Sequence, residues 1–219
     1  IGNDGYLKLT DFGFAKVLNE GRTFTICGTP EYIAPEVILN QGHGKAVDWW
    51  TLGVLIYEMH AGIDPFNDED PMGIYKNILR GKISFPSSFD KDAKSLVKHL
   101  LVADLSKRYG NLKDGDYLFY SGVNDIKRHR WFNNFSWDDL MKKKIKPSYV
   151  PVVKSLGDVS NFDEYPDSGS HAQDIKPSLD PFLTGDYFDY SITFKAFLLF
   201  FLDYFIIWIL SVKYFICGV

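Results

Sequence analysis

The sequence predicts a mainly α-helical fold with one residual strand of a β-hairpin and an extended C-terminal tail. Two observations predict the helices. Apolar residues recur at helical spacing over 91–102, and the segment 49–59 is apolar nearly all round, as in a buried helix. A third observation predicts the tail, because the chain from Lys142 onward is polar, irregular and rich in proline.

The first elements in the chain are a strand and a long loop. Residues 6–10 alternate apolar and polar side chains after Asn3-Asp4-Gly5, so we predict the outgoing strand of a hairpin there. The stretch 11–35 follows with several glycines and prolines and little periodicity. A loop of this length in a compact domain is usually functional.

Four helices are predicted after this loop. Asp48 is a good N-cap residue because its carboxylate accepts the free amide hydrogens of a first turn, so we expect it to begin the helix over 49–59. The other predicted helices span 71–80, after Asp70-Pro71, and then 91–102 and 124–131.

Composition excludes several classes of protein. The 219 residues are 46% hydrophobic and 24% charged, which is typical of a globular protein. A net charge of −4 at pH 7 gives no basic field, so we expect no nucleic-acid partner. Two cysteines and five scattered histidines exclude a disulfide framework and a zinc hydrolase, and they favour a reducing, intracellular setting.

An ordered set of motifs is more specific than any single element. Asp11-Phe12-Gly13 comes first, GTPEYIAPE spans 28–36, and Asp48-Trp49-Trp50, Lys107-Arg108 and the sequence SNFDEY follow. This set resembles the large lobe of AGC-group serine/threonine protein kinases of the cAMP-dependent type, over a stretch from residue 5 to about residue 165. The implied fold is a partial, helical protein-kinase C-lobe followed by the extended tail of that group.

The resemblance implies three segments. A partial kinase domain spans 1–132, an AGC-kinase tail spans 133–190, and a hydrophobic extension spans 191–219. Residues 196–212 of the extension are apolar enough for a marginal membrane span, but we favour translation past the natural end. Residues 116–122 interrupt the family pattern, and we interpret them either as a surface-loop insertion or as intron-derived sequence.

The resemblance also implies a reaction, the transfer of the γ-phosphate of ATP, with Mg²⁺, to serine or threonine in proteins that carry arginine before the acceptor. Asp11 matches the magnesium ligand, since a carboxylate is a hard oxygen donor. The positions that match the family's nucleotide site are Asp11, Phe12, Gly13, Phe162 and Tyr165.

Further positions match regulatory and substrate-binding residues of the family. Thr25 matches the activation-loop phosphorylation site, and Lys16 matches a cation that binds its phosphate. The substrate-binding positions are Ile26, Thr29, Pro30, Glu31, Ile33 and Glu58. Glu31 and Glu58 match carboxylates that bind substrate arginines, although Glu58 has the alternative of a helix carboxylate facing water. The structural positions are Asp48 and the ion pair of Glu36 with Arg108.

Some motifs of the family are absent from these 219 residues. They contain no GxGxxG loop, no VAIK-type lysine and no HRDLKPEN-type catalytic loop with its base aspartate, so no catalytic residue is assigned. We therefore interpret the sequence as part of a longer kinase and expect the 219 residues alone to be inactive, because these groups act as a unit.

Two other functions stay open at this point, together with partners and location. One is a catalytically dead binding module that engages a cAMP-binding regulatory subunit or a pseudosubstrate through Glu31, Glu58, Phe24 and Tyr75. The other is a tail-anchored membrane fragment. A regulatory subunit and arginine-containing protein substrates are the expected partners, and the cytoplasm or the nucleus is the expected location in preference to a membrane.

Overall fold

A computed structural model describes residues 1–18, 21–112, 122–162 and 214–216. The helices are α1 (Pro35–Ile38), α2 (Ala46–Ala61), α3 (Pro71–Arg80), α4 (Lys91–Leu100), α5 (Val123–Lys127) and α6 (Trp137–Met141), with 3-10 turns η1 (Pro30–Tyr32) and η2 (Arg130–Phe132). The strands are β1 (Ala15–Val17) and β2 (Tyr214–Ile216). The predicted fold class, mainly helical with little strand, is confirmed.

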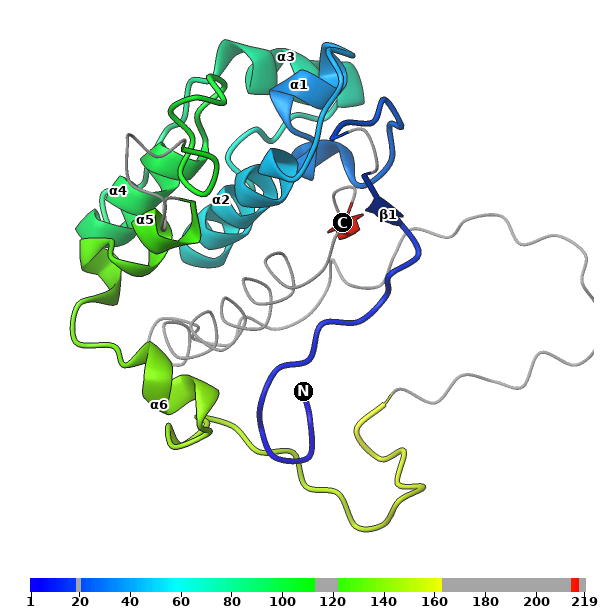
Figure 1. Cartoon of the computed structure of the whole chain (residues 1–219), viewed down its shortest axis with the longest axis vertical. Helices are drawn as coiled ribbons and strands as arrows, with labels where there is room; N and C mark the ends of the chain where they lie inside the picture. The colour runs from blue at the N-terminus through cyan, green and yellow to red at the C-terminus, as the bar shows by residue number, and fades with distance from the viewer. Residues whose placement is uncertain (19–20, 113–121, 163–213, 217–219) are drawn as a thin grey trace, which may run out of the picture.

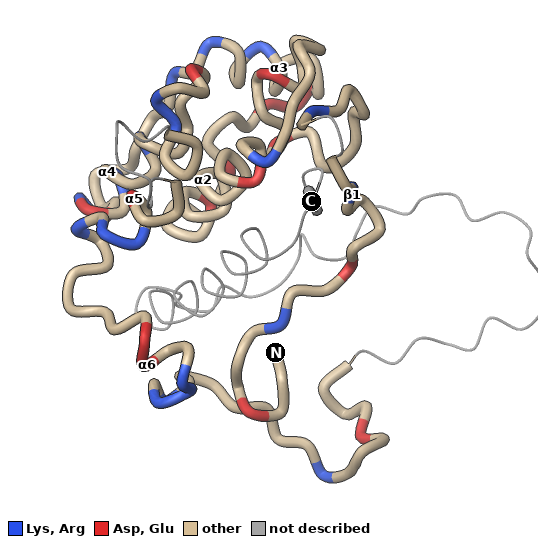
Figure 2. The backbone as a smooth tube through the Cα atoms, viewed as in Figure 1, with Lys and Arg blue, Asp and Glu red and all other residues tan. Residues whose placement is uncertain are grey.

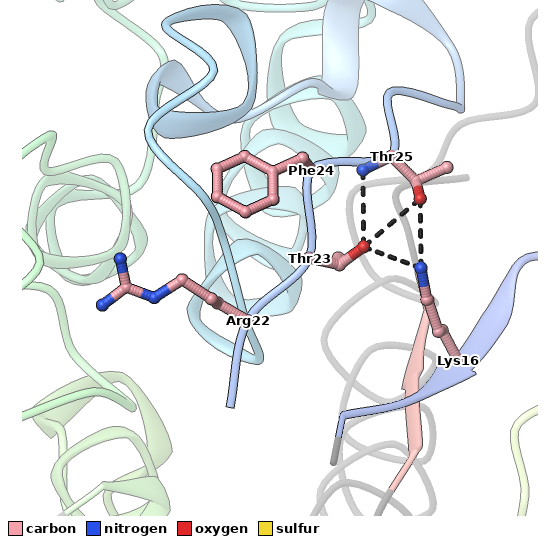
Figure 3. Close-up of a pocket in the computed structure, with 5 residues that line it drawn as sticks. All are labelled: Lys16, Arg22, Thr23, Phe24 and Thr25. Atoms are coloured by element: carbon pink, nitrogen blue, oxygen red, sulfur yellow. Dashed lines mark hydrogen bonds between the residues drawn. The ribbon is translucent and has the colours of Figure 1, made fainter. Parts of the chain in front are cut away.

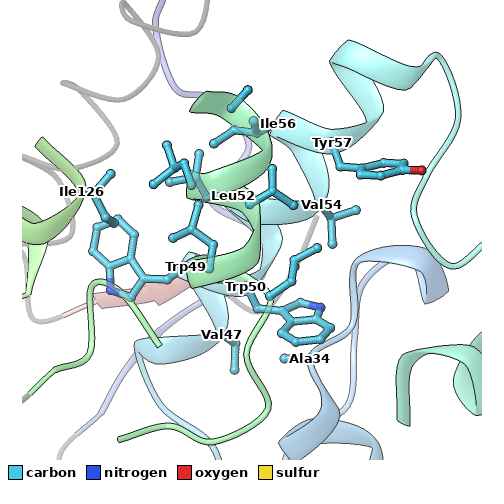
Figure 4. Packing of buried hydrophobic residues seen from close by; sticks show 14 of the residues in the cluster. Ala34, Val47, Trp49, Trp50, Leu52, Val54, Ile56, Tyr57 and Ile126 are labelled. Carbon is cyan, nitrogen blue, oxygen red and sulfur yellow. The ribbon is translucent and has the colours of Figure 1, made fainter. Parts of the chain in front are cut away.

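The core lies where α2 packs against α4 (Figure 1). Gly53 allows this close approach, because a Cβ at that position would lie 2.9 Å from Leu100 Cβ and 2.8 Å from Leu101 Cδ2. Figure 4 shows Trp50, Leu52, Val54 and Ile56 of α2 in this packing. These side chains are almost completely excluded from solvent, and so are Leu96, Val97 and Leu100 of α4. The apolar face predicted for 91–102 is therefore the face that forms the core.

Two of the predicted helices form with nearly the expected bounds. Helix α3 spans 71–80 as predicted, because the Asp70 carboxylate accepts a hydrogen bond from Met72 N (3.2 Å) and Gly81 ends the helix at φ 64°. Helix α4 begins after Asp90, whose carboxylate accepts hydrogen bonds from two amides of the first turn. It ends at Leu100 rather than at residue 102.

Two other helix predictions need correction. Asp48 is not the N-cap of α2, because the helix begins at Ala46 and Asp48 lies buried inside its first turn. The helix predicted over 124–131 is two elements, α5 and η2. His129 lies between them in an extended conformation, and its ring accepts a hydrogen bond from Trp131 N, which begins η2.

The strand predicted over 6–10 is also wrong. That segment forms no strand in the described ranges, and β1 lies further along the chain, antiparallel to β2 with Ala15 opposite Ile216. The alternation of residues 6–10 has another cause. Tyr6 is buried against Leu140 of α6, Leu7 packs on the same small cluster and Leu9 packs on the main core, whereas Lys8 and Thr10 are exposed.

The N-terminal segment is fastened to the chain just beyond α6 by two contacts. Tyr6 Oη donates a hydrogen bond to Ile145 O (2.7 Å), and Lys143 Nζ lies 2.6 Å from Asp4 Oδ2. Gly5, at φ 81°, lies so close to Tyr149 O that a Cβ would be 2.6 Å from it. We call these contacts the terminal clasp. Acidic and basic residues mix around α6 (Figure 2), where Lys142 pairs with Asp138.

Some sequence predictions fall outside the described residues. They include most of the expected insertion at 116–122, Tyr165, the tail beyond residue 162 and the apolar segment 196–212. Within the ranges that are described, no helix is long and apolar enough to cross a membrane.

Candidate functional site

Asp11, Phe12 and Gly13 form a tight exposed turn ahead of β1. Asp11 has φ 57°, a left-handed conformation that aspartate tolerates because its short side chain can hydrogen-bond locally, and its Oδ1 accepts from Gly13 N (3.3 Å). Ala15 N donates to Phe12 O (3.0 Å) and closes the turn. The Asp11 carboxylate therefore stands in solvent, and Phe12 is 46% exposed.

Asp11 can supply one ligand to a magnesium ion. Its carboxylate is a hard oxygen donor, and Mg²⁺ is usually held by one or two protein carboxylates together with phosphate oxygens and water. Across the described residues, no group of three or more His, Cys, Asp or Glu residues could hold a metal ion. The turn thus fits a magnesium ion that arrives with a phosphate-bearing ligand, and it does not form a complete metal site.

A pocket of about 640 Å³ opens at the predicted phosphorylation site (Figure 3). It is lined by Lys16 of β1 and by Arg22, Thr23, Phe24 and Thr25. Lys16 Nζ donates to Thr23 Oγ1 (2.9 Å) and to Thr25 Oγ1 (3.2 Å). The structure therefore brings together Thr25 and Lys16, the two residues that the sequence assigned to this role, whereas the guanidinium of Arg22 points away from both (Figure 3).

Sequence analysis gave no role to His43, which lies buried beside this pocket. Thr23 and His43 form an isolated antiparallel bridge through two hydrogen bonds of 2.8 Å, so the loop and the segment before α2 are held together. The imidazole of His43 is 2% exposed, and burial lowers its pKa. A single histidine between two glycines carries no sequence signal for this position.

Glu58 does not face water as a free helix carboxylate. It is partly buried on α2, and Tyr32 Oη donates a hydrogen bond to its Oε2. Burial, this hydrogen bond and the charges of Glu58, Asp64 and Glu31 together raise the pKa of Tyr32 above its usual range. Three carboxylates thus act on one phenol, and we call Glu31, Glu58 and Asp64 the acidic group.

Two members of the acidic group have different hydrogen bonding. Asp64, which sequence analysis missed, accepts hydrogen bonds of 2.9 Å from Phe66 N and from Asn67 Nδ2. Glu31 lies in η1, and its Oε2 is buried without a hydrogen-bond partner among the described residues. A buried carboxylate oxygen without a donor is costly, so Glu31 is suited to accept a hydrogen bond from a bound cationic group.

The other predicted substrate-binding residues do not share one surface. Ile26 is 58% exposed, Thr29 is exposed and Pro30 is partly buried at the start of η1. Ile33 is 5% exposed and packs in the core. Phe162, assigned to the nucleotide site, is 75% exposed in the tail.

The predicted pair of Glu36 and Arg108 is buried. Arg108 Nη1 and Nη2 donate to the two carboxylate oxygens of Glu36 at 2.6 and 2.9 Å. The remaining donors reach Ala46 O (3.0 Å) and Val102 O (2.8 Å), and the guanidinium lies 5.2 Å from the Trp50 ring centre. This ion pair holds α1 against α2. It thereby also positions η1, the turn just before α1 that carries Glu31.

Comparison with known proteins gives consistent matches. A family model described as a protein kinase domain matches residues 1–132. The chain is 54% identical over 178 residues to cAMP-dependent protein kinase catalytic subunit 3 of Drosophila melanogaster, covering 81% of this chain and 28% of that protein. It is 52% identical over 168 residues to cAMP-dependent protein kinase catalytic subunit PRKX of Homo sapiens, covering 77% of this chain and 45% of the relative.

A third relative is about equally similar. The cAMP-dependent protein kinase catalytic subunit of Dictyostelium discoideum is 53% identical over 165 residues, which is 75% of this chain and 24% of that protein. The chain therefore spans less than half the length of these curated relatives.

Proposed function

Because this chain belongs to the protein kinase domain family, we propose that it forms the helical lobe of a serine/threonine protein kinase of the cAMP-dependent type. Three relatives named as catalytic subunits of that type, each more than 50% identical to the chain, support the proposal. The observation that carries it in the structure is the acidic group around Tyr32, which suits a substrate that presents arginine.

Arginine would bind the acidic group through charge-assisted hydrogen bonds. The guanidinium is planar and donates two parallel hydrogen bonds to a carboxylate, which adds direction as well as energy. The buried Oε2 of Glu31 lacks a donor among the described residues, and a substrate guanidinium would supply one. Tyr32 holds the Glu58 carboxylate in place through its hydroxyl hydrogen bond, so the second acceptor is oriented before substrate arrives.

Protein kinases use ATP and Mg²⁺, and the metal neutralises the phosphate charge that develops during transfer. In this chain, Asp11 would hold one magnesium ion through its exposed carboxylate. Its hydrogen bond to Gly13 N orients one carboxylate oxygen and leaves the side chain at the surface, where a nucleotide-bound cation can reach it.

The 219 residues alone are not expected to transfer phosphate. They contain none of the GxGxxG loop, the paired lysine or the catalytic-loop aspartate, and loss of several members of such a set acts as loss of the whole. Peptide docking depends on residues that are present here, whereas nucleotide binding keeps a single carboxylate ligand. We therefore propose that peptide docking is the part of the reaction that the residues of this chain serve.

A fused chain tests this function. The part of the Drosophila relative that precedes the region of similarity is joined to this chain, and transfer of labelled phosphate to a serine peptide with two preceding arginines is measured. We expect activity from the fusion, none from the 219 residues alone, and loss of activity in Asp11→Asn. Glu58→Gln is expected to raise KM for the arginine peptide and to leave KM for ATP unchanged.

Two controls decide the outcome of this experiment. Lys107→Gln, an exposed position outside the acidic group, should leave both KM values unchanged. A folded fusion that transfers no phosphate would refute the kinase assignment, and an unchanged peptide KM in Glu58→Gln would refute arginine recognition by the acidic group.

We also propose a cAMP-binding regulatory subunit as partner, located with this protein in the cytoplasm or the nucleus. The supporting observations are the exposed Phe24 beside Thr25 and the acidic group, which together offer an apolar and an anionic contact. Pull-down of this chain by an immobilised regulatory subunit, reduced in Glu31→Gln, is the expected result. Absence of binding by folded chain would refute the partner.

A further inference from the structure

His43 lies next to Thr23, one of the residues that line the pocket at Lys16. Its backbone pairs with Thr23 in both directions, and Thr23 Oγ1 accepts hydrogen bonds from Lys16 Nζ (2.9 Å) and from Thr25 N (3.4 Å). The His43 imidazole interacts with the backbone of Thr25. One short network therefore connects the ring of His43 to Thr25, and the ring itself is shielded from solvent.

The charged groups around His43 come from several elements. Lys16 of β1 disfavours a proton on the ring, whereas Glu36 of α1 favours one. Glu36 is itself paired with Arg108, which limits what it can offer to His43. Arg22 also lines the pocket, but its guanidinium points away from Lys16 and Thr25 (Figure 3). Burial dominates these effects and keeps the imidazole neutral near pH 7.

A phosphate on Thr25 would change this balance. It adds about 1.5 to 2 negative charges at the exposed side chain of Thr25, next to a network whose His43 and Thr23 are buried. Lys16 is the near cation, at 3.2 Å from Thr25 Oγ1, and a single lysine does not neutralise a doubly charged phosphate. The ring of His43 is the neighbouring group that can acquire a positive charge by taking a proton.

We propose that His43 binds a proton when Thr25 carries a phosphate, so that the phosphorylated loop is held by the Lys16 ammonium and the His43 imidazolium together. This inference rests on the proposed phosphorylation of Thr25. The phosphate is then bound more firmly at mildly acidic pH than at alkaline pH. Such coupling is reciprocal. The factor by which the phosphate on Thr25 raises the proton affinity of His43 equals the factor by which the proton strengthens the contacts that hold this phosphate.

The test compares two forms of the full 219-residue chain, one with threonine and one with genetically encoded phosphothreonine at position 25. Imidazole resonances of ¹³C-labelled histidine are followed from pH 5 to pH 8.5. We expect the titration midpoint of His43 to rise by about one pH unit or more in the phosphorylated form, the size typical for a charge close to a titrating group. His43→Gln assigns the signal.

The other histidines are internal controls. His60 packs on Phe89 and His99 packs on Tyr109, away from the pocket lining, so their midpoints should be the same in both forms. In the phosphorylated Lys16→Gln variant, which lacks the competing cation, the His43 midpoint should rise further. An unchanged or lower His43 midpoint on phosphorylation would overturn the proposal, and so would an equal rise at His60.

This experiment separates the inference from the function on which it rests. The phosphate is installed during synthesis, so the result does not depend on whether the protein transfers phosphate itself. A shifted His43 together with an inactive fusion would keep the inference and refute the kinase assignment. An unshifted His43 together with an active fusion would do the reverse.

Discussion

Replacing Arg108 by methionine is expected to lower the free energy of unfolding by about 3–5 kcal/mol. Arg108 is fully buried, and its side chain donates two hydrogen bonds to Glu36 and one each to Ala46 O and Val102 O. Methionine fills a similar volume but leaves the Glu36 carboxylate, 5% exposed, without its counter-charge. An uncompensated buried charge dominates this loss.

The size of this effect is large relative to the whole molecule. Domains of this kind unfold with about 5–15 kcal/mol, so the substitution removes a large share of the total. A loss of about 4 kcal/mol changes the folding equilibrium constant by nearly a thousandfold, since 1.4 kcal/mol corresponds to a factor of ten. Urea unfolding followed by far-ultraviolet circular dichroism measures it directly.

The neighbouring residue provides the control. Lys107 is 75% exposed and pairs with Asp104 at the surface, so Lys107→Met should leave the unfolding midpoint unchanged within error. The double variant Glu36→Gln with Arg108→Met removes both charges and should be more stable than Arg108→Met alone. If Arg108→Met unfolds at the same urea concentration as Lys107→Met, the buried pair does not hold this lobe together.

Three further predictions concern pH, capping and packing. Burial and the charges of neighbouring cations lower the pKa of His129, so the folded protein binds this proton less readily than the unfolded chain does. The free energy of unfolding therefore keeps this contribution above pH 6.5 and loses it as the pH falls below that value. His129→Asn keeps an acceptor for Trp131 N and should lose less stability between pH 7 and pH 5, as measured by thermal unfolding. Asp90→Ala removes the cap of α4 and should lower stability by about 1 kcal/mol in urea unfolding. Gly53→Ala should lower it by about 1–3 kcal/mol through overlap with leucines at the end of α4, whereas Gly157→Ala, in open space, should leave it unchanged.

The parts of the fold that depend on local signals were predictable from the sequence. Helix α3 was predicted at its correct bounds from Asp70 and Pro71, which mark its start by local effects, and the structure shows that Gly81 ends it through local backbone freedom. Helix α4 was predicted from one apolar face, and that face is buried. Such signals need no knowledge of the rest of the chain.

The wrong predictions involve contacts between distant segments. The alternation of residues 6–10 indicates a strand, but a strand requires a neighbour, and the docking of Tyr6 on Leu140 accounts for the apolar position instead. Asp48 has the chemistry of an N-cap, yet α2 begins two residues earlier, and a pattern of capping residues alone does not reveal that start.

The candidate site shows the same division. Lys16 and Thr25 were paired through a motif, and the structure places them within hydrogen-bond distance. His43 and Asp64 were missed because neither belongs to a motif, and only the folded chain brings them beside Thr25 and Tyr32. Residues that act through proximity alone leave no spacing pattern in the sequence.

The terminal clasp has a mechanical consequence. Asp4 and Tyr6 form hydrogen bonds with residues 139 positions further along the chain. These contacts lie outside the packing of α2 against α4. Tension between the N-terminal segment and the tail would therefore act first on these two contacts, because they bypass the chain between residues 6 and 143. Because the clasp consists of few contacts, it would open before α2 and α4 separate, and its opening would lengthen the molecule while the core stays packed.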